Sequence, residues 1–154
     1  DYSPLLKSDY VAYTRLIESD VSRESFDTFI DEVLGPNHHI MVQKAGGELV
    51  GTGTLFVEPK LTYGGCKMGH IENVLVRPDH RKKGYGEQIV CKLLEKAKAQ
   101  NVTVFVCGLS MKKFNIKPQQ LPNNIHTTEN GILYSFQLIK KGSFRLTIYF
   151  AISS

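Results

Sequence analysis

The fold of this chain is decided by residues 70–100, which read HIENVLVRPDHRKKGYGEQIVCKLLEKAKAQ. The first seven of these residues are largely apolar or β-branched, which is typical of a strand. From Gly84 to about Gln100, apolar residues recur at helical spacing, which predicts a helix with one buried face. That face is expected to consist of Ile89, Val90, Leu93, Leu94 and Ala97. The stretch therefore predicts a strand, a tight turn and an amphipathic helix.

The next apolar run completes a larger unit. Residues 102–107 read VTVFVC, a near-continuous apolar run of strand length. Such a run is expected for a buried strand that lies parallel to the strand before the helix. Strand, turn, helix and strand together predict one right-handed βαβ crossover.

Two helices are predicted before this unit. Ser8 is a candidate N-cap for the first and Ser22 for the second, and Gly35-Pro36 ends the second. The helical spacing rests on Tyr10, Tyr13, Leu16 and Ile17 in the first segment and on Phe26, Phe29, Ile30, Val33 and Leu34 in the second.

The remaining segments favour strand or loop. Residues 39–43 and 49–58 are rich in apolar and β-branched residues on either side of Gly46-Gly47, which predicts a β-hairpin. Residues 108–131 contain only scattered apolar groups, and a structureless loop of that length would be unusual inside a compact domain, so the sequence leaves their structure open. Residues 132–139 and 143–152 are equally compatible with a closing hairpin and with irregular structure.

Composition sets the class of protein. With 154 residues, 42% of them hydrophobic and 22% charged, the chain is expected to form one domain over residues 1–154. Neither a membrane-spanning run nor a signal pattern is found, so no membrane association is expected. Cys66, Cys91 and Cys107 form no CxxC pair, which favours a cytoplasmic protein without a metal site. A net charge of +4 is too small to indicate nucleic-acid binding.

The turn before the long helix carries the candidate chemistry. It reads RKKGYG over residues 81–86, where the unbonded amides of a helix start would converge. Gly84 and Gly86 lack the Cβ atoms that would keep a pyrophosphate away from the backbone, and the basic residues add positive charge. Glycine-rich helix starts also occur for steric reasons alone, and this spacing matches neither the Walker pattern nor GxGxxG.

The context of this turn adds specificity. An apolar strand, Arg-Pro-Asp-His, Arg-x-x-Gly-x-Gly and an amphipathic helix together resemble the signature motif of the GNAT acetyltransferases. The resemblance implies an α/β (α+β) fold with a mixed, mostly antiparallel sheet flanked by helices, and acetyl-CoA as co-substrate. The cofactor-binding residues that it implies are Val74, Leu75 and Val76 on the strand and Arg81, Lys82, Lys83, Gly84, Tyr85, Gly86 and Glu87 at the turn.

A second resemblance concerns the acceptor. The segment PKLTYGG over residues 59–65, followed by GHIENV over 69–74, is similar to the glucosamine 6-phosphate N-acetyltransferases, whose hallmark is Gly-His-Ile-Glu-Asp. It implies that the loop lines a sugar phosphate pocket and that the chain forms a homodimer in UDP-N-acetylglucosamine biosynthesis. The residues it assigns to the substrate are Lys60, Leu61, Thr62, Tyr63, Glu72 and Asn73, with Glu72 and Asn73 at the reacting amine. Asn73 replaces the family's Asp, and an amide cannot act as a base.

The expected mechanism is direct attack of the amine on the thioester, with Glu72 taking the proton and a backbone N-H near Val74 stabilising the oxyanion. The three cysteines are expected to be spectators, and His70 is expected to be structural. After Val106 the sequence departs from the family pattern, because its acidic-Cys and Asn-x-x-Phe-Tyr elements are missing from the atypical segment 108–154. Two alternatives therefore stay open: an acetyltransferase for another small amine or a protein amine, and a non-catalytic CoA-binding module.

Overall fold

The computed structural model of the protein describes residues 1–59, 61, 65, 67–100, 102, 104–107, 117, 119, 126–128 and 146–147. The first sheet is antiparallel and consists, in spatial order, of β1 (Tyr2–Pro4), β2 (His38–Ala45), β3 (Glu48–Pro59) and β4 (Lys67–Val76). The second contains β5 (Val104–Cys107) between β6 (His126–Thr128) and β7 (Leu146–Thr147). The expected mostly antiparallel sheet flanked by helices is confirmed.

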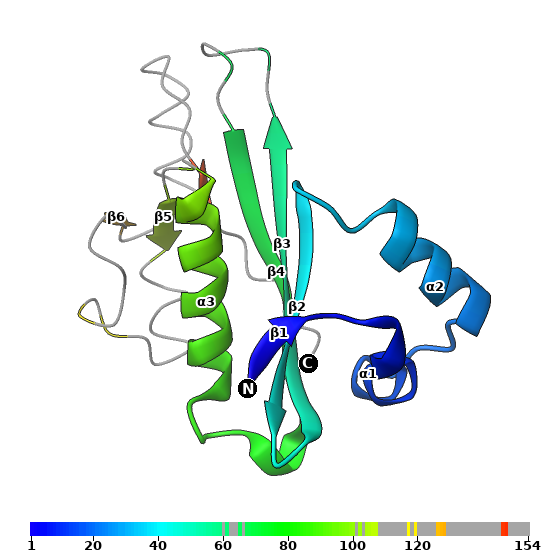
Figure 1. The fold of residues 1–154 in the computed structure, drawn as a ribbon. Helices are drawn as coiled ribbons and strands as arrows, with labels where there is room; N and C mark the ends of the chain where they lie inside the picture. The colour runs from blue at the N-terminus through cyan, green and yellow to red at the C-terminus, as the bar shows by residue number, and fades with distance from the viewer. Residues whose placement is uncertain are drawn as a thin grey trace.

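Helices cover both faces of the first sheet. Helix α3 (Tyr85–Ala99) lies on one face, and α1 (Tyr10–Leu16) and α2 (Arg23–Glu32) lie on the other (Figure 1). Short 3-10 turns, η1 (Lys7–Asp9) and η2 (Pro78–His80), precede α1 and α3. No helix in the described part of the chain has the length and apolar character needed to cross a membrane.

One predicted helix cap is confirmed and the other is wrong. Ser22 caps α2, because its hydroxyl accepts a hydrogen bond of 3.1 Å from the backbone N-H of Ser25. Ser8 does not cap α1 but lies inside η1. The backbone N-H of Leu6 instead donates to the carboxylate of Asp9 at 3.0 Å. A 3-10 turn thus extends the first helical segment toward the N-terminus, which displaces the cap from the predicted position.

The predicted β2–β3 hairpin is confirmed. Ala45 pairs with Glu48, which leaves Gly46 and Gly47 as a two-residue turn with φ of +59° and +84°. Two consecutive left-handed residues are the requirement of a type I′ turn, the turn whose twist matches that of the flanking strands. The glycines therefore set the register between β2 and β3.

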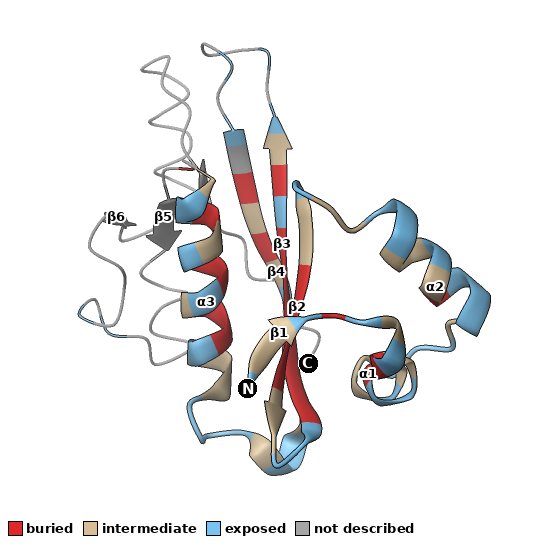
Figure 2. Ribbon diagram, in the orientation of Figure 1, coloured by how far each residue is buried: buried red, intermediate tan, exposed pale blue. Residues whose placement is uncertain are grey.

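The α3 face of the sheet is aliphatic and closely packed. Every residue of the predicted helix face is buried, namely Ile89, Val90, Leu93, Leu94 and Ala97 (Figure 2). On β3 the facing positions include Gly51 and Gly53, where an added Cβ would lie only 2.8 and 2.6 Å from side-chain carbons of Ile89. These glycines let the helix approach the strand, and the approach fixes α3 and the turn that precedes it.

The opposite face is packed differently. Its cluster combines aliphatic and aromatic side chains, and the rings of Tyr10 and Phe26 meet edge to face at 5.2 Å. Thr52 is also buried there, and its hydroxyl donates to the carbonyl of Met41 at 2.9 Å. The buried members of the cluster are Leu5, Tyr13, Phe26, Ile40, Val42 and Leu49.

Strand β5 forms within the apolar run predicted to contain it. Figure 1 shows β4 and β5 running in the same direction, with α3 returning between them. The described residues of β5 pair in parallel with β6 and β7. Within residues 108–131, whose structure the sequence left open, the structure describes strand β6. Its partner β5 is distant in sequence, so this pairing leaves no local signal. The proposed closing hairpin lies outside the described residues except for β7, which is parallel to β5.

Candidate active site

The turn before α3 has a backbone conformation that can form an anion-binding concavity. Lys82 and Gly84 both have left-handed backbones, with φ of +62° and +82°. Left-handed residues within a turn direct N-H groups toward a common point, which makes an anion-binding concavity. The first helical hydrogen bond of α3 joins the N-H of Gln88 to the carbonyl of Gly84 at 3.0 Å. The amides of Tyr85 and Gly86 precede that bond and lie at the positive end of the helix dipole.

Different physical constraints favour glycine at positions 84 and 86 of the turn. Gly84 is favoured by its left-handed backbone, which L side chains adopt with strain. A Cβ at Gly86 would lie 3.7 Å from Val76 Cγ2, an ordinary van der Waals distance. Packing therefore does not demand glycine at position 86. A ligand that lies against the backbone would favour glycine here, as the sequence-based prediction of a pyrophosphate site expects.

Positive charge surrounds this concavity. Arg81, Lys82 and Lys83 are exposed, and the guanidinium of Arg81 donates to the carbonyl of Val76 at 3.2 Å. That bond holds Arg81 against the end of β4. Tyr85 places its ring 6.0 Å from the ring of His80, which gives the turn an aromatic side. The predicted phosphate-binding residues are thus brought together at one end of β4.

Arg77 has a role that the sequence did not reveal. Its guanidinium forms two hydrogen bonds with Asp79, at 2.7 and 2.9 Å, and one of 2.8 Å with Glu48. The bonds from Arg77 hold the pKa of Asp79 well below its usual range, and the two carboxylates raise the pKa of Arg77. Arg77 therefore belongs to an ion-pair tie between the β2–β3 hairpin and η2, and its charge is neutralised there. No local pattern could have indicated Glu48 as its partner.

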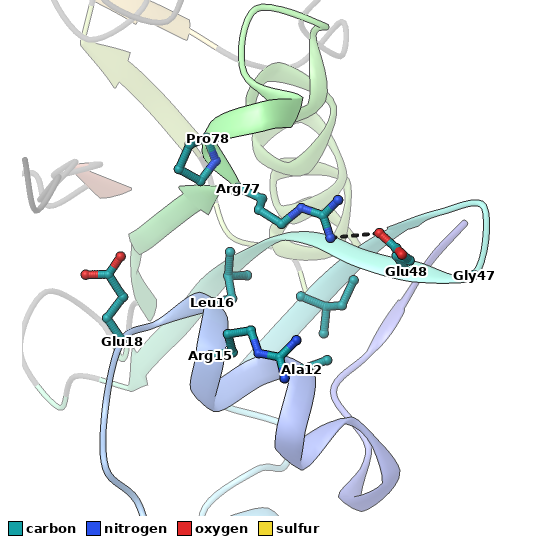
Figure 3. Close-up of a pocket in the computed structure, with 9 residues that line it drawn as sticks. Ala12, Arg15, Leu16, Glu18, Gly47, Glu48, Arg77 and Pro78 are labelled. Atoms are coloured by element: carbon teal, nitrogen blue, oxygen red, sulfur yellow. Dashed lines mark hydrogen bonds and ion pairs between the residues drawn. The ribbon is translucent and has the colours of Figure 1, made fainter.

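A pocket of about 510 Å³ adjoins this tie. Figure 3 shows it between α1, the hairpin and the end of β4, with the Arg77–Glu48 ion pair forming one wall. Apolar groups from α1 and β3 meet charged groups at its sides. The lining residues include Ala12, Arg15, Leu16, Glu18, Leu49 and Pro78.

Strand β4 carries a bulge at the predicted catalytic residues. Thr52 pairs with Leu75, whereas Thr54 pairs with Glu72, so Gly53 faces two residues of β4. Asn73, one of those two, is exposed and has a φ of +53°. A bulge interrupts the ladder and increases the local twist. Asparagine tolerates this backbone better than most residues, which was the one local signal of the bulge.

The bulge in β4 places the predicted site residues on different faces of the sheet. Glu72 is half-buried on the α1–α2 face, because its neighbour Ile71 points into the α3 core. Val74 is buried in that same core, so only its backbone can contact a ligand. Leu75 and Val76 are half-buried and lead to the turn. Because the bulge takes one residue out of the ladder, roughly 10 Å of strand separates Glu72 from Val76. The site thus has a phosphate end and a carboxylate end, joined by β4.

The predicted sugar phosphate loop is only partly described. Leu61 is fully exposed, and Lys60, Thr62 and Tyr63 lie outside the described residues. Glu87 is half-buried in the first turn of α3. In the residues that the structure describes, no group of three or more His, Cys, Asp or Glu side chains could hold a metal ion.

Comparison with known proteins agrees with this geometry. The sequence profile of the Acetyltransferase (GNAT) family matches residues 5–114, and the chain belongs to that family. Its members use acetyl-CoA as co-substrate. The matched region includes the turn, the bulge and both helices of the α1–α2 face.

More specific similarity covers shorter regions. A glucosamine 6-phosphate N-acetyltransferase from Trypanosoma brucei brucei is 39% identical over 66 residues, 43% of this chain and 45% of that protein. A probable glucosamine 6-phosphate N-acetyltransferase 2 from Oryza sativa subsp. japonica is 41% identical over 69 residues, 42% of each. The chain thus matches less than half the length of either relative.

A solved structure resembles the whole chain. The crystal structure of glucosamine-6-phosphate N-acetyltransferase from Arabidopsis thaliana superposes with a TM-score of 0.61 over 99% of this chain and 97% of that one. The two sequences are 21% identical in this superposition, so the likeness establishes the fold.

Proposed function

We propose that this protein transfers the acetyl group of acetyl-CoA to the amine of glucosamine 6-phosphate. One observation carries the proposal: the basic, glycine-containing turn before α3 follows the end of β4, and the bulge beside Glu72 lies about 10 Å back along the same strand. A coenzyme with a diphosphate and a long thiol-bearing arm needs these two features at such a separation. The similarity to proteins named glucosamine 6-phosphate N-acetyltransferases supports the acceptor.

Each part of the site would have a distinct task. The amides of the turn hold the diphosphate, and the strand edge at Leu75 and Val76 pairs with the arm. The described ladders pair β4 with β3, and the arm would have to pair with the opposite edge of β4 beside Leu75 and Val76. Holding both substrates in one cleft lowers the barrier by about 7–11 kcal/mol in well-aligned systems.

The reaction itself would use few side chains. The amine attacks the thioester carbonyl, Glu72 takes the proton of the amine directly or through water, and the thiolate leaves. The bulge removes a residue from the ladder with β3, so a backbone N-H near Val74 can donate to the oxyanion. Asn73 hydrogen-bonds the sugar without acting as a base. The loop with Lys60, Leu61, Thr62 and Tyr63 would hold the sugar phosphate, and a homodimer would complete the site.

Two measurements test the proposal. Calorimetric titration with acetyl-CoA should give saturable binding, and a thiol-release assay should show turnover with glucosamine 6-phosphate in preference to a panel of other amines and peptides. Preference for a different amine would overturn the acceptor while keeping the acetyl transfer. Tight binding without turnover of any amine would favour a CoA-binding module, and no binding by folded protein would sink the proposal entirely.

A further inference from the structure

A row of aromatic rings crosses the α1–α2 face of the sheet. His38, Phe56 and His70 are direct register partners on β2, β3 and β4. The rings of His38 and Phe56 lie 5.6 Å apart at an interplanar angle of 74°, and those of Phe56 and His70 lie 6.2 Å apart and nearly parallel, at 27°. Phe29 of α2 ends the row, 5.6 Å from His38. We call Phe56 and His70 the ring pair.

The ring pair lies beside Glu72. Its neighbours Leu55, Val57 and Ile71 point into the α3 core, so Phe56 and His70 point to the opposite face. Glu72 follows His70 by two positions and therefore shares that face. The next row of paired residues across the two strands consists of Thr54 and Glu72. The carboxylate end of the site thus continues directly into the ring pair.

The ring pair is also open. Phe56 is 36% exposed although β3 is an interior strand of its sheet, with β2 and β4 paired on either side. The side chain of His70 is 26% exposed. A central strand usually has its large apolar side chains covered, and here the described residues leave an aromatic face accessible. A ligand that covers it would gain apolar burial.

The charge around the ring pair selects the ligand. Glu58 lies 3.9 Å from His70 Nε2 and is 39% exposed, and Glu72 lies on the other side of His70 along β4. Two carboxylates beside aromatic rings attract a cationic amine attached to a ring with an apolar face. Imidazole can also donate to or accept from a hydroxyl group. An amino sugar combines all three properties.

We propose that Phe56 and His70 form the floor of the acceptor site, on which the apolar face of an amino sugar packs while its amine reaches Glu72. This inference rests on the proposed function and deepens it by naming acceptor-binding residues outside the loop at 60–63. The ring pair acts on acceptor binding and leaves the binding of acetyl-CoA unchanged. Substitutions in the ring pair are therefore expected to change KM for the acceptor.

The test uses steady-state kinetics of the full chain with acetyl-CoA and glucosamine 6-phosphate. Phe56→Leu preserves apolar volume but removes the ring, and Phe56→Tyr restores a ring. We expect Phe56→Leu to raise KM for the acceptor about tenfold, with kcat and the Kd of acetyl-CoA within about twofold of the unsubstituted protein. Phe56→Tyr should return KM to near its original value. Val11→Ala, at a residue 63% exposed on α1, is the matched control and should change nothing.

The outcomes separate this inference from the proposed function. If the unsubstituted protein acetylates glucosamine 6-phosphate and Phe56→Leu leaves KM unchanged, the ring pair is not the acceptor floor and the proposed function stands. A parallel weakening of acetyl-CoA binding would also overturn the inference, since it would indicate a general structural role. If the unsubstituted protein acetylates no amine, the proposed function fails and the inference fails with it. His70→Gln should repeat the KM effect independently of residue 56.

Discussion

The two faces of the four-stranded sheet are built from different side chains. Against α3 the packing is aliphatic and fully buried, and glycines at positions 51 and 53 bring helix and strand together. Against α1 and α2 the packing contains aromatic rings and buried hydroxyl groups, and it opens at Phe56. A closely packed interface fixes positions, whereas a mixed and partly open one offers contacts to a ligand. In the proposed function, the α3 face positions the turn at residues 81–86 and the other face receives the acceptor.

The largest expected effect lies on the open face. Glu72→Gln should reduce kcat about 100-fold or more, because the amide cannot accept the proton of the amine. The free energy of unfolding should stay nearly unchanged, since Glu72 is only half-buried. Thiol-release kinetics and thermal unfolding measure the two quantities. Glu95→Gln, on the exposed side of α3, is the matched control, and an unaltered rate in Glu72→Gln would remove Glu72 from the mechanism.

The next effect lies on the closed face and concerns stability. Gly53→Ala places a Cβ 2.6 Å from Ile89 Cγ2 and 2.9 Å from Leu93 Cδ1, so the core must shift. We expect a loss of about 1–3 kcal/mol in the free energy of unfolding, measured by denaturant titration. Gly35→Ala is the control, because a Cβ there would meet nothing within 4 Å. Equal stability of the two variants would mean that close approach of α3 is not what the glycine provides.

A smaller effect is expected at the turn before α3, where we propose that the diphosphate of acetyl-CoA binds. Gly86→Ala should weaken acetyl-CoA binding about tenfold, comparable to the loss of one backbone hydrogen bond. Stability should not fall, because the added Cβ makes an ordinary contact with Val76. Calorimetric titration and thermal unfolding together separate these outcomes. Unchanged affinity would argue against contact between the ligand and the backbone at this position.

The smallest effect is expected at Cys91, a half-buried residue of α3 near β1 and β2. Cys91→Ser should leave turnover unchanged, as predicted for a spectator. Burial raises the pKa of the Cys91 thiol, so thiolate forms only above the usual range and alkylation should be slow at pH 7 and accelerate as pH rises. Peptide mapping after alkylation at several pH values measures the extent of alkylation at Cys91 separately from the other cysteines. Rapid alkylation at neutral pH would contradict it.

The sequence predicted correctly the features that depend on interactions between residues close together in the chain. The apolar face of α3, the Ser22 cap and the Gly46-Gly47 turn depend on residues close in sequence, and all three are confirmed. The Ser8 cap was wrong because η1 extends the first helical segment with Asp9 as the bonded group. Strand β6 was missed because its partner β5 is about twenty residues away along the chain, and pairing at that separation has no local signal.

In the candidate site, too, some features could be predicted from the sequence and others depend on contacts between distant segments. The glycine spacing and basic residues indicated the phosphate turn, and the resemblance to a family indicated Glu72. The bulge at Asn73 and the tie from Arg77 to Glu48 depend on pairing between distant strands, so sequence reasoning could not place them. The ring pair likewise exists only through the register of β3 with β4.

The ion pairs of Arg77 and the packing of α3 on β3 respond differently to salt concentration. Glycine-mediated packing of α3 involves no charge, and added salt leaves it intact. The Arg77–Glu48 and Arg77–Asp79 pairs are exposed, and mobile ions screen such pairs over about 8 Å at physiological ionic strength. Raising the salt concentration should therefore weaken the Arg77–Glu48 link between the hairpin and η2, while the packing of α3 against β3 stays unchanged.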